Sequence, residues 1–186
     1  MPLTLPNILT LLRVAAIPVV LALFYLPLEH ARQVSALLFG AACVTDWVDG
    51  YLARAWKQVS RFGAFLDPVA DKLLVAVSLI MLLHVHPNGM LAVLVVIIIG
   101  REITISALRE WMAELGQRAR VAVGWVGKVK TGFQMTAIGL MLWQQSVWGI
   151  PVYKVGFWLL FVASLLTVYS MLIYLRAAWP SMRESA

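Results

Sequence analysis

Residues 46–71 read Asp-Trp-Val-Asp-Gly-Tyr-Leu-Ala-Arg-Ala-Trp-Lys-Gln-Val-Ser-Arg-Phe-Gly-Ala-Phe-Leu-Asp-Pro-Val-Ala-Asp and contain every aspartate of the 186-residue chain. Asp46 and Asp49 are separated by one helical turn, and so are Asp67 and Asp71. On helices, such spacings place each pair on one face. Because the link between the pairs is short, we expect the two faces to meet across an antiparallel pair of helices.

The composition outside this stretch predicts a membrane protein. Hydrophobic residues make up 62% of the chain and charged residues 13%, with a mean hydropathy of +0.86. Soluble domains have about 45–50% apolar and about 25% charged residues. At about 20 residues per span, the length allows six transmembrane helices in a single all-α domain, residues 1–186. The expected spans are Asn7–Leu26, Val34–Ala53, Pro68–Val85, Met90–Leu108, Val126–Trp143 and Val152–Leu175.

The basic residues predict the orientation of these spans. Lysine and arginine outnumber acidic residues by 15 to 9. If the N-terminus is cytoplasmic, every basic residue except Arg32 and Lys154 falls on the inner side. Cytoplasmic loops of membrane proteins carry this excess of positive charge. We therefore expect a multi-pass protein of the cell's inner membrane with both termini, and the aspartates, facing the cytoplasm.

The aspartates indicate a metal site. A carboxylate at the centre of a membrane helix costs about 2.5–3.5 kcal/mol on insertion scales, so four together need a compensating cation. Carboxylate oxygens suit Mg²⁺ or Mn²⁺, and four of them could hold two such ions, the arrangement used in phosphoryl displacement. The alternative is that these are ordinary interfacial aspartates, solvated or paired with Arg54, Lys57 and Lys72.

Small and basic residues beside the aspartates favour a phosphate ester as substrate. Gly50 and Gly63 leave room for a bulky ester to approach the backbone. Arg54 lies on the short cytoplasmic side of this stretch, where a guanidinium can pair with a diphosphate through two hydrogen bonds.

Eight residues of this stretch, in the pattern Asp46-x2-Asp49-Gly50-x2-Ala53-Arg54-x8-Gly63-x3-Asp67-x3-Asp71, match the signature of the CDP-alcohol phosphatidyltransferases, and the chain resembles that family. The resemblance implies a six-helix membrane fold, a homodimer, and a polar cavity open to the cytoplasm. It implies a two-metal centre held by Asp46, Asp49, Asp67 and Asp71, with Asp71 as the general base. It further implies a CDP-diacylglycerol site lined by Gly50, Ala53, Arg54 and Gly63.

The acceptor alcohol has to be inferred from the rest of the chain. Arg101 interrupts an apolar run and should face a partner or a cavity. With Arg109, Lys128 and Lys130 it forms a basic group suited to a phosphate monoester, and Glu102 is a candidate partner for a basic residue elsewhere.

Three further stretches, 6–13, 101–110 and 127–131, resemble the phosphatidylglycerophosphate synthases of this family. They add Asn7, Thr10 and Thr131 as candidate hydrogen-bonding residues. The resemblance implies transfer of a phosphatidyl group from CDP-diacylglycerol to sn-glycerol 3-phosphate, giving phosphatidylglycerol phosphate and CMP, a step in phospholipid biosynthesis. The alternatives are another acceptor within the family (inositol phosphate, serine or phosphatidylglycerol) and, from a different class, a small cation transporter. No nucleic-acid partner is expected.

Overall fold

A computed structural model describes residues 5–55, 61–116 and 125–184, and six helices form the regular structure of these ranges. This confirms the prediction of an all-helical protein. The helices are α1 (Leu5–Tyr25), α2 (Ala31–Ala55), α3 (Arg61–Val85), α4 (Gly89–Glu114), α5 (Trp125–Trp143) and α6 (Val152–Glu184).

Each predicted span corresponds to one helix, but three helices extend well beyond the apolar runs, by more than a turn. Helix α3 begins at Arg61 instead of Pro68, so Pro68 lies inside it, and α4 and α6 continue beyond Leu108 and Leu175. The added segments are polar, and hydropathy alone cannot distinguish a helix end from a loop in such segments. These extensions place Asp67 and Arg109 on helices rather than at their margins.

Four of the helices in the described part are long and apolar enough to cross a membrane. Their candidate spans are Ile8–Tyr25, Phe65–Val85, Gly89–Glu114 and Val152–Trp179, with mean hydropathies between 1.8 and 2.3. Many large apolar side chains on these helices are exposed, such as Leu12, Val96 and Leu165. Exposed hydrocarbon of this extent is expected where the solvent is lipid. The protein is therefore embedded in a membrane.

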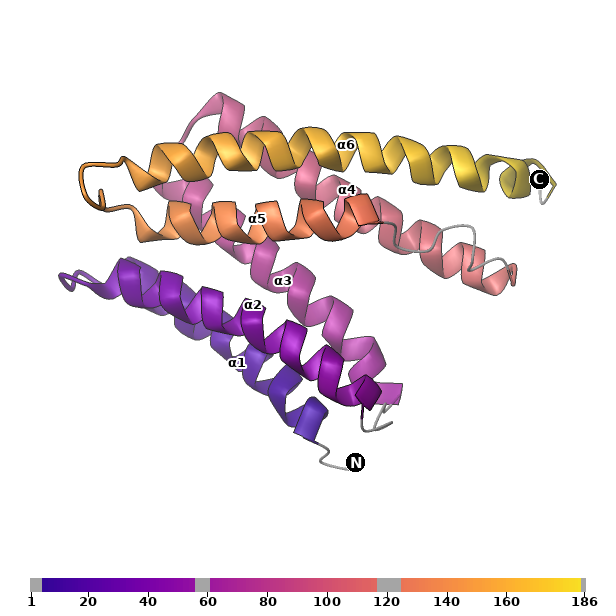
Figure 1. The fold of residues 1–186 in the computed structure, drawn as a ribbon, viewed down its shortest axis with the longest axis horizontal. Coiled ribbons are helices and arrows are strands. Elements are labelled where there is room, and N and C mark those ends of the chain that lie inside the picture. The colour runs from indigo at the N-terminus through magenta and orange to yellow at the C-terminus, as the bar shows by residue number, and fades with distance from the viewer. Residues whose placement is uncertain (1–4, 56–60, 117–124, 185–186) are drawn as a thin grey trace.

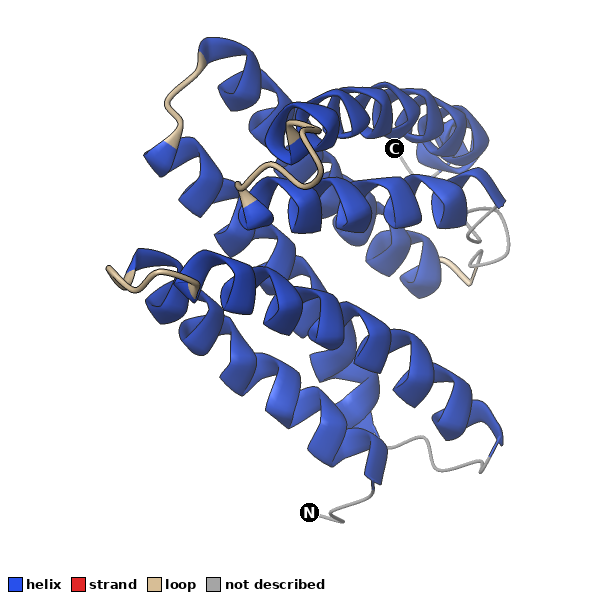
Figure 2. Cartoon of the chain, turned by 60° about the vertical axis from the view of Figure 1, so that its left-hand side comes forward, coloured by secondary structure: helices blue, strands red, loops and turns tan. Residues whose placement is uncertain are grey.

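Five of the helices form two antiparallel pairs joined by a crossing helix, and α4 packs against α6 and α3 (Figure 1). Helix α1 packs along α2, and α5 packs along α6, while α3 contacts α1, α4 and α5. The connections after α1, α3 and α5 lie at one end of the molecule, and the two chain termini lie toward the other (Figure 1). Figure 2 shows these connections as tan loops between the helices. The ends of the helices that carry the predicted site residues therefore gather on the side of the termini.

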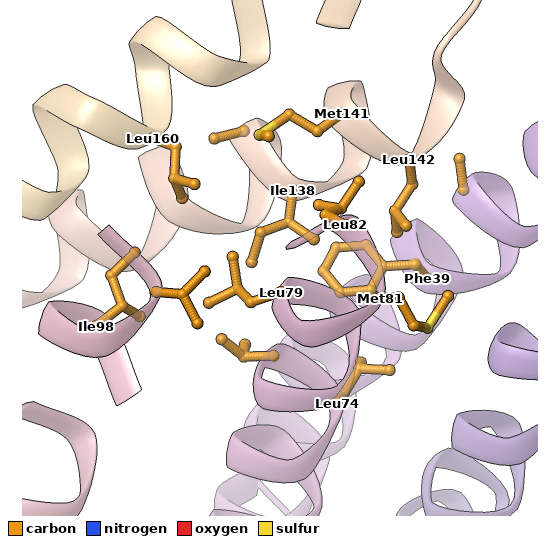
Figure 3. Packing of buried hydrophobic residues seen from close by; sticks show 14 of the residues in the cluster. Phe39, Leu74, Leu79, Met81, Leu82, Ile98, Ile138, Met141, Leu142 and Leu160 are labelled. Carbon is orange, nitrogen blue, oxygen red and sulfur yellow. The ribbon is translucent and has the colours of Figure 1, made fainter. Parts of the chain in front are cut away.

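A hydrophobic core joins the two pairs. Leu79 and Leu82 of α3, Ile138 of α5, Ile98 of α4 and Leu160 of α6 are all completely buried in one cluster (Figure 3). Phe39 of α2 enters the same cluster, 1% exposed. This packing fixes α3, α4 and α5 relative to one another and so sets the geometry of the cavity between them.

Gly156 determines how closely α5 and α6 approach. A Cβ atom at this position would lie 2.8 Å from the carbonyl oxygen of Ala137 and 2.8 Å from Cγ of Met141. Small residues at such crossings let membrane helices pack backbone to backbone. Helix α5 is therefore held against α6 along the part that follows the cavity.

Candidate active site

A polar cavity of about 340 Å³ lies between α3, α4 and α5. It is at the lower end of the usual range for small-molecule sites. Most of the residues that line it carry a charged or hydrogen-bonding side chain. The residues around it are Pro68, Asp71, Lys72, Val75, Arg101, Glu102, Ser106, Arg109, Thr131, Gln134 and Met135.

Helix α3 contributes Asp71 and Lys72 to this cavity. The ammonium group of Lys72 donates a hydrogen bond to the hydroxyl of Ser106 on α4. Asp71 lies between two groups of charges, since it interacts electrostatically with Arg13 and Asp46 on one side and with Glu102 and Lys130 on the other. A carboxylate in this position can receive a proton from a substrate bound among the basic residues.

Glu102 organises the basic side of the cavity. One of its carboxylate oxygens, Oε1, accepts hydrogen bonds from Arg101 at 2.8 Å and from Lys130 on α5 at 2.7 Å. Arg101 is 7% exposed and Lys130 only 1%, so both cations need a partner inside the membrane. The predicted pairing of Glu102 with a basic residue is confirmed. Lys130 therefore approaches the cavity through Glu102 and is not part of its lining.

Arg101 and Arg109 each have one side-chain N–H group that is not used in a hydrogen bond in the described structure. In both side chains it is the buried Nε–H group. The guanidinium of Arg109 also lies over the ring of Tyr174 on α6, 5.5 Å from its centroid, a cation–π geometry that fixes its position. Both arginines line the cavity, where a guanidinium group can pair with an anionic ligand.

The remaining described aspartates lie beside this cavity, at the junction of α1, α2 and α3. Arg13 of α1 is buried and donates to Oδ1 of Asp46 on α2 at 2.5 Å. Thr10, one turn earlier, donates a hydrogen bond to Asp67 on α3. Helix α1 thus contacts one carboxylate on each of its two neighbours, Asp46 on α2 and Asp67 on α3.

The carboxylates are close enough to repel one another. Asp46 interacts unfavourably with both Asp67 and Asp71. Among the residues whose side chains the structure describes, no three acidic, histidine or cysteine residues are grouped as a metal site. The side chain of Asp49, the fourth predicted ligand, lies outside that part. The donor set, all carboxylate oxygens with unfavourable like-charge contacts, fits a hard divalent cation.

Several predicted site residues lie where the structure describes the backbone but not the side chain. The side chains of Asn7, Asp49, Gly50, Ala53, Arg54 and Lys128 belong to this group. Gly63 is described and is buried near the start of α3. Of the predicted residues with described side chains, the cavity lining includes Asp71, Arg101, Arg109 and Thr131, whereas Thr10 contacts Asp67.

Four polar residues of the site were not predicted from the sequence as site residues. They are Arg13, Lys72, Ser106 and Gln134. Helical spacing gave a signal for Gln134, which follows Lys130 by one turn and so shares its face. No comparable signal linked Arg13 to Asp46, because the two residues contact each other across 33 positions of sequence.

A second, larger cavity has a different character. It is an apolar groove of about 640 Å³ between α2 and α5, bordered by residues such as Leu37, Phe39, Leu140 and Trp143. Its lining has no charged side chain among the described residues. A groove of this kind suits hydrocarbon and offers nothing to a phosphate, whereas the smaller polar cavity has the charged groups that a phosphate needs.

Comparison with known proteins agrees with the geometry. Residues 3–169 match the sequence profile of the CDP-alcohol phosphatidyltransferase family. Proteins named CDP-diacylglycerol--glycerol-3-phosphate 3-phosphatidyltransferase are similar to the chain over 178 residues, 96% of both lengths. They include proteins from Salmonella choleraesuis (strain SC-B67) at 52% identity and from Shigella flexneri and Escherichia coli (strain K12) at 51%. The chain is therefore a member of the CDP-alcohol phosphatidyltransferase family.

Proposed function

We propose that the protein transfers the phosphatidyl group of CDP-diacylglycerol to sn-glycerol 3-phosphate, giving phosphatidylglycerol phosphate and CMP. The observation that carries this proposal is the cavity in which Asp71 stands beside Arg101, Arg109 and Lys72. It combines a base with a site for a phosphate monoester. The relatives of the chain bear the name of this activity over nearly their whole length.

Asp71 is the general base of the proposed reaction. An alcohol is a weak nucleophile, and a carboxylate within hydrogen-bond reach can take its proton as the new bond forms. The acceptor oxygen attacks the phosphorus that carries diacylglycerol, the bond from that phosphorus to the CMP oxygen breaks, and the proton passes to Asp71. The lipid tails remain in the bilayer while the reacting groups meet in the cavity.

The acceptor phosphate binds at the basic side of the cavity. Arg101 and Arg109 offer unpartnered guanidinium N–H groups there, and Lys72 adds a third positive charge. Glu102 and Lys130 hold Arg101 in position. Lys128 joins this group by sequence, and Thr131 lines the cavity as a hydroxyl donor. A doubly charged phosphate gains more from such a site than a zwitterion does.

Two divalent cations, Mg²⁺ or Mn²⁺, complete the proposed site. Asp46, Asp67 and Asp71 would hold them, since Asp46 interacts unfavourably with the other two carboxylates, and Asp49 joins them on the resemblance to the family signature. When bound, such ions neutralise the diphosphate and make CMP a better leaving group. The CDP-diacylglycerol headgroup is placed beside them by Gly50, Ala53, Arg54 and Gly63, on the resemblance of this stretch to the family signature.

The proposed orientation in the membrane is inferred from the location of the termini and of the basic residues. We propose that all six helices cross the inner membrane, with both termini and the cavity on the cytoplasmic side. The two termini lie toward one end of the bundle (Figure 1), and most of the basic residues belong to the helix ends and links on that side of the sequence-based topology. The family resemblance adds a homodimer as the expected assembly.

Release of CMP tests the proposal directly. Purified protein in detergent should release CMP from CDP-diacylglycerol when sn-glycerol 3-phosphate and Mg²⁺ are both present, and EDTA should abolish the release. Serine, inositol phosphate and phosphatidylglycerol serve as competing acceptors in parallel reactions. Faster turnover with any of these would assign the protein to a different activity of the family.

Replacing Arg101 should separate the two substrates. Arg101→Met keeps the buried stem but removes the guanidinium, and a charged hydrogen bond is worth about 1.5–3 kcal/mol. We expect roughly a tenfold or larger loss of kcat/KM for glycerol 3-phosphate, with little change in the KM for CDP-diacylglycerol.

Arg32 provides the matched control for this variant. It is an exposed arginine of α2 that contacts Gln144 outside the cavity, so Arg32→Met should leave both parameters near their wild-type values. An Arg101→Met protein that lost only CDP-diacylglycerol affinity would reverse the proposed assignment of the two ends of the site.

A further inference from the structure

Gln134 is a buried polar side chain without a complete set of partners. It lies on α5, is 2% exposed, and its Oε1 has no hydrogen-bond partner in the described structure. A buried polar atom left unpaired is costly, and such atoms usually have a reason in function or a bound partner. Because Gln134 lines the polar cavity, a ligand in that cavity can satisfy it.

The position of Gln134 within the cavity indicates which part of a ligand it meets. Asp71 comes from α3, and Arg101 and Arg109 come from α4, whereas Gln134 approaches from α5 with Thr131 one turn before it. An acceptor that places its reacting hydroxyl at Asp71 and its phosphate at the arginines has its middle carbon between these two ends. Because α3 and α4 supply the groups for the two ends, the polar residues that α5 adds to the lining, Thr131 and Gln134, are left for the middle of the acceptor.

We propose that the Gln134 amide binds the hydroxyl of the acceptor that does not react, and so selects polyol phosphates over hydroxyalkyl phosphates that lack this second hydroxyl. The inference rests on the proposed function. It adds a specificity residue whose oxygen accepts from the middle hydroxyl of glycerol 3-phosphate. A terminal amide offers both an acceptor oxygen and donor hydrogens, which suits a hydroxyl group better than a phosphate.

Gln33 shows why burial alone does not make a site. It is also buried, at 8% exposure, and its Oε1 also lacks a partner in the described structure. Gln33 lies near the start of α2, toward the opposite end of that helix from Asp46, and it is not part of the cavity lining. The two glutamines therefore form a matched pair that differs in access to the ligand.

The experiment compares two acceptors on the purified full-length enzyme with CDP-diacylglycerol and Mg²⁺. One acceptor is sn-glycerol 3-phosphate, and the other is 3-hydroxypropyl phosphate, which lacks only the middle hydroxyl. A neutral hydrogen bond corresponds to roughly a three- to tenfold preference, so the wild type should favour glycerol 3-phosphate in kcat/KM by about that factor. A wild-type preference below twofold would overturn the inference without any variant.

The variants then assign the preference to one side chain. Gln134→Leu should lower kcat/KM for glycerol 3-phosphate until it approaches that for the analogue, whose own value should hardly change. Gln134→Asn keeps a polar amide but shortens it, so it should fold like the wild type and lose part of the preference. Gln33→Leu should leave the preference intact.

The outcomes also separate this inference from the proposed function. If the wild type does not release CMP with glycerol 3-phosphate, the proposed function is wrong. If it does, and folded Gln134→Leu or Gln134→Asn protein keeps the full preference, only the role of Gln134 is wrong. Equal losses for both acceptors would mean that Gln134 is structural, and would likewise overturn it.

Discussion

Asp71→Asn is expected to abolish phosphatidyl transfer while leaving most of the metal-dependent affinity for CDP-diacylglycerol in place. The substitution keeps the size of the side chain and one oxygen ligand but removes the oxygen that accepts the proton. General base catalysis contributes about 10²–10⁴-fold to such reactions. The measurement pairs turnover with CDP-diacylglycerol affinity on the same purified protein at saturating Mg²⁺.

Asp46→Asn is the comparison for this experiment. Asp46 belongs to the carboxylate group but lies outside the polar cavity, so its loss should weaken the affinity for CDP-diacylglycerol as well as turnover. A residual rate above about a tenth of wild type in Asp71→Asn would exclude the base role. If Asp71→Asn lost nucleotide-lipid affinity as completely as Asp46→Asn, Asp71 would be reassigned as a metal ligand alone.

Arg13→Met is expected to destabilise the protein and to inactivate it. Arg13 is 2% exposed and donates to Asp46 at 2.5 Å, which joins α1 to α2. Removing one member of a buried ion pair costs about 3–5 kcal/mol. Because the Asp46 side chain is 41% exposed, we expect a smaller loss of about 2–3 kcal/mol. For a chain of this length the melting temperature should fall by roughly 5–10 °C.

Two further variants test separately the positive charge of Arg13 and its pairing with Asp46. Arg13→Lys keeps the positive charge and should lose less stability than Arg13→Met. Adding Asp46→Asn to Arg13→Met should cost little more, because the two residues act as one unit. An exposed arginine of α6, Arg176, should tolerate the same change to methionine with an unchanged melting temperature. An Arg13→Met protein that melts like the wild type would show that the pair does not stabilise the fold.

The helices could be predicted from the sequence because lipid leaves few alternatives. A long apolar run must be a helix when no water can satisfy its backbone, so each run gave one helix at nearly the correct place. The ends were less well predicted, because polar residues such as Arg61 and Arg109 continue α3 and α4 where hydropathy no longer distinguishes helix from loop. Pro68 was taken as a helix start and instead lies within α3.

The kinds of residue that form the site could be predicted from the sequence, but most of the contacts between helices could not. The face of Asp67 and Asp71 could be inferred from spacing within one helix, and so could the need of Arg101 for a partner. The contact of Lys130 with Glu102 joins two helices across 28 positions of sequence, and such contacts depend on how the helices rotate against each other. Gln134 was missed because it lies within an otherwise apolar run and carries no charge.

The core beneath the cavity has a consequence for the electrochemical gradient of the membrane. A polar cavity that opens into the bilayer from one side would conduct ions if polar groups continued from it to the other side. On each wall the lining changes to hydrocarbon within about two turns, at Leu79 on α3, Ile98 on α4 and Ile138 on α5, all completely buried. These three side chains offer a migrating ion no polar partner, so in the described part of the chain the cavity ends on hydrocarbon and not on a path toward the other face of the membrane.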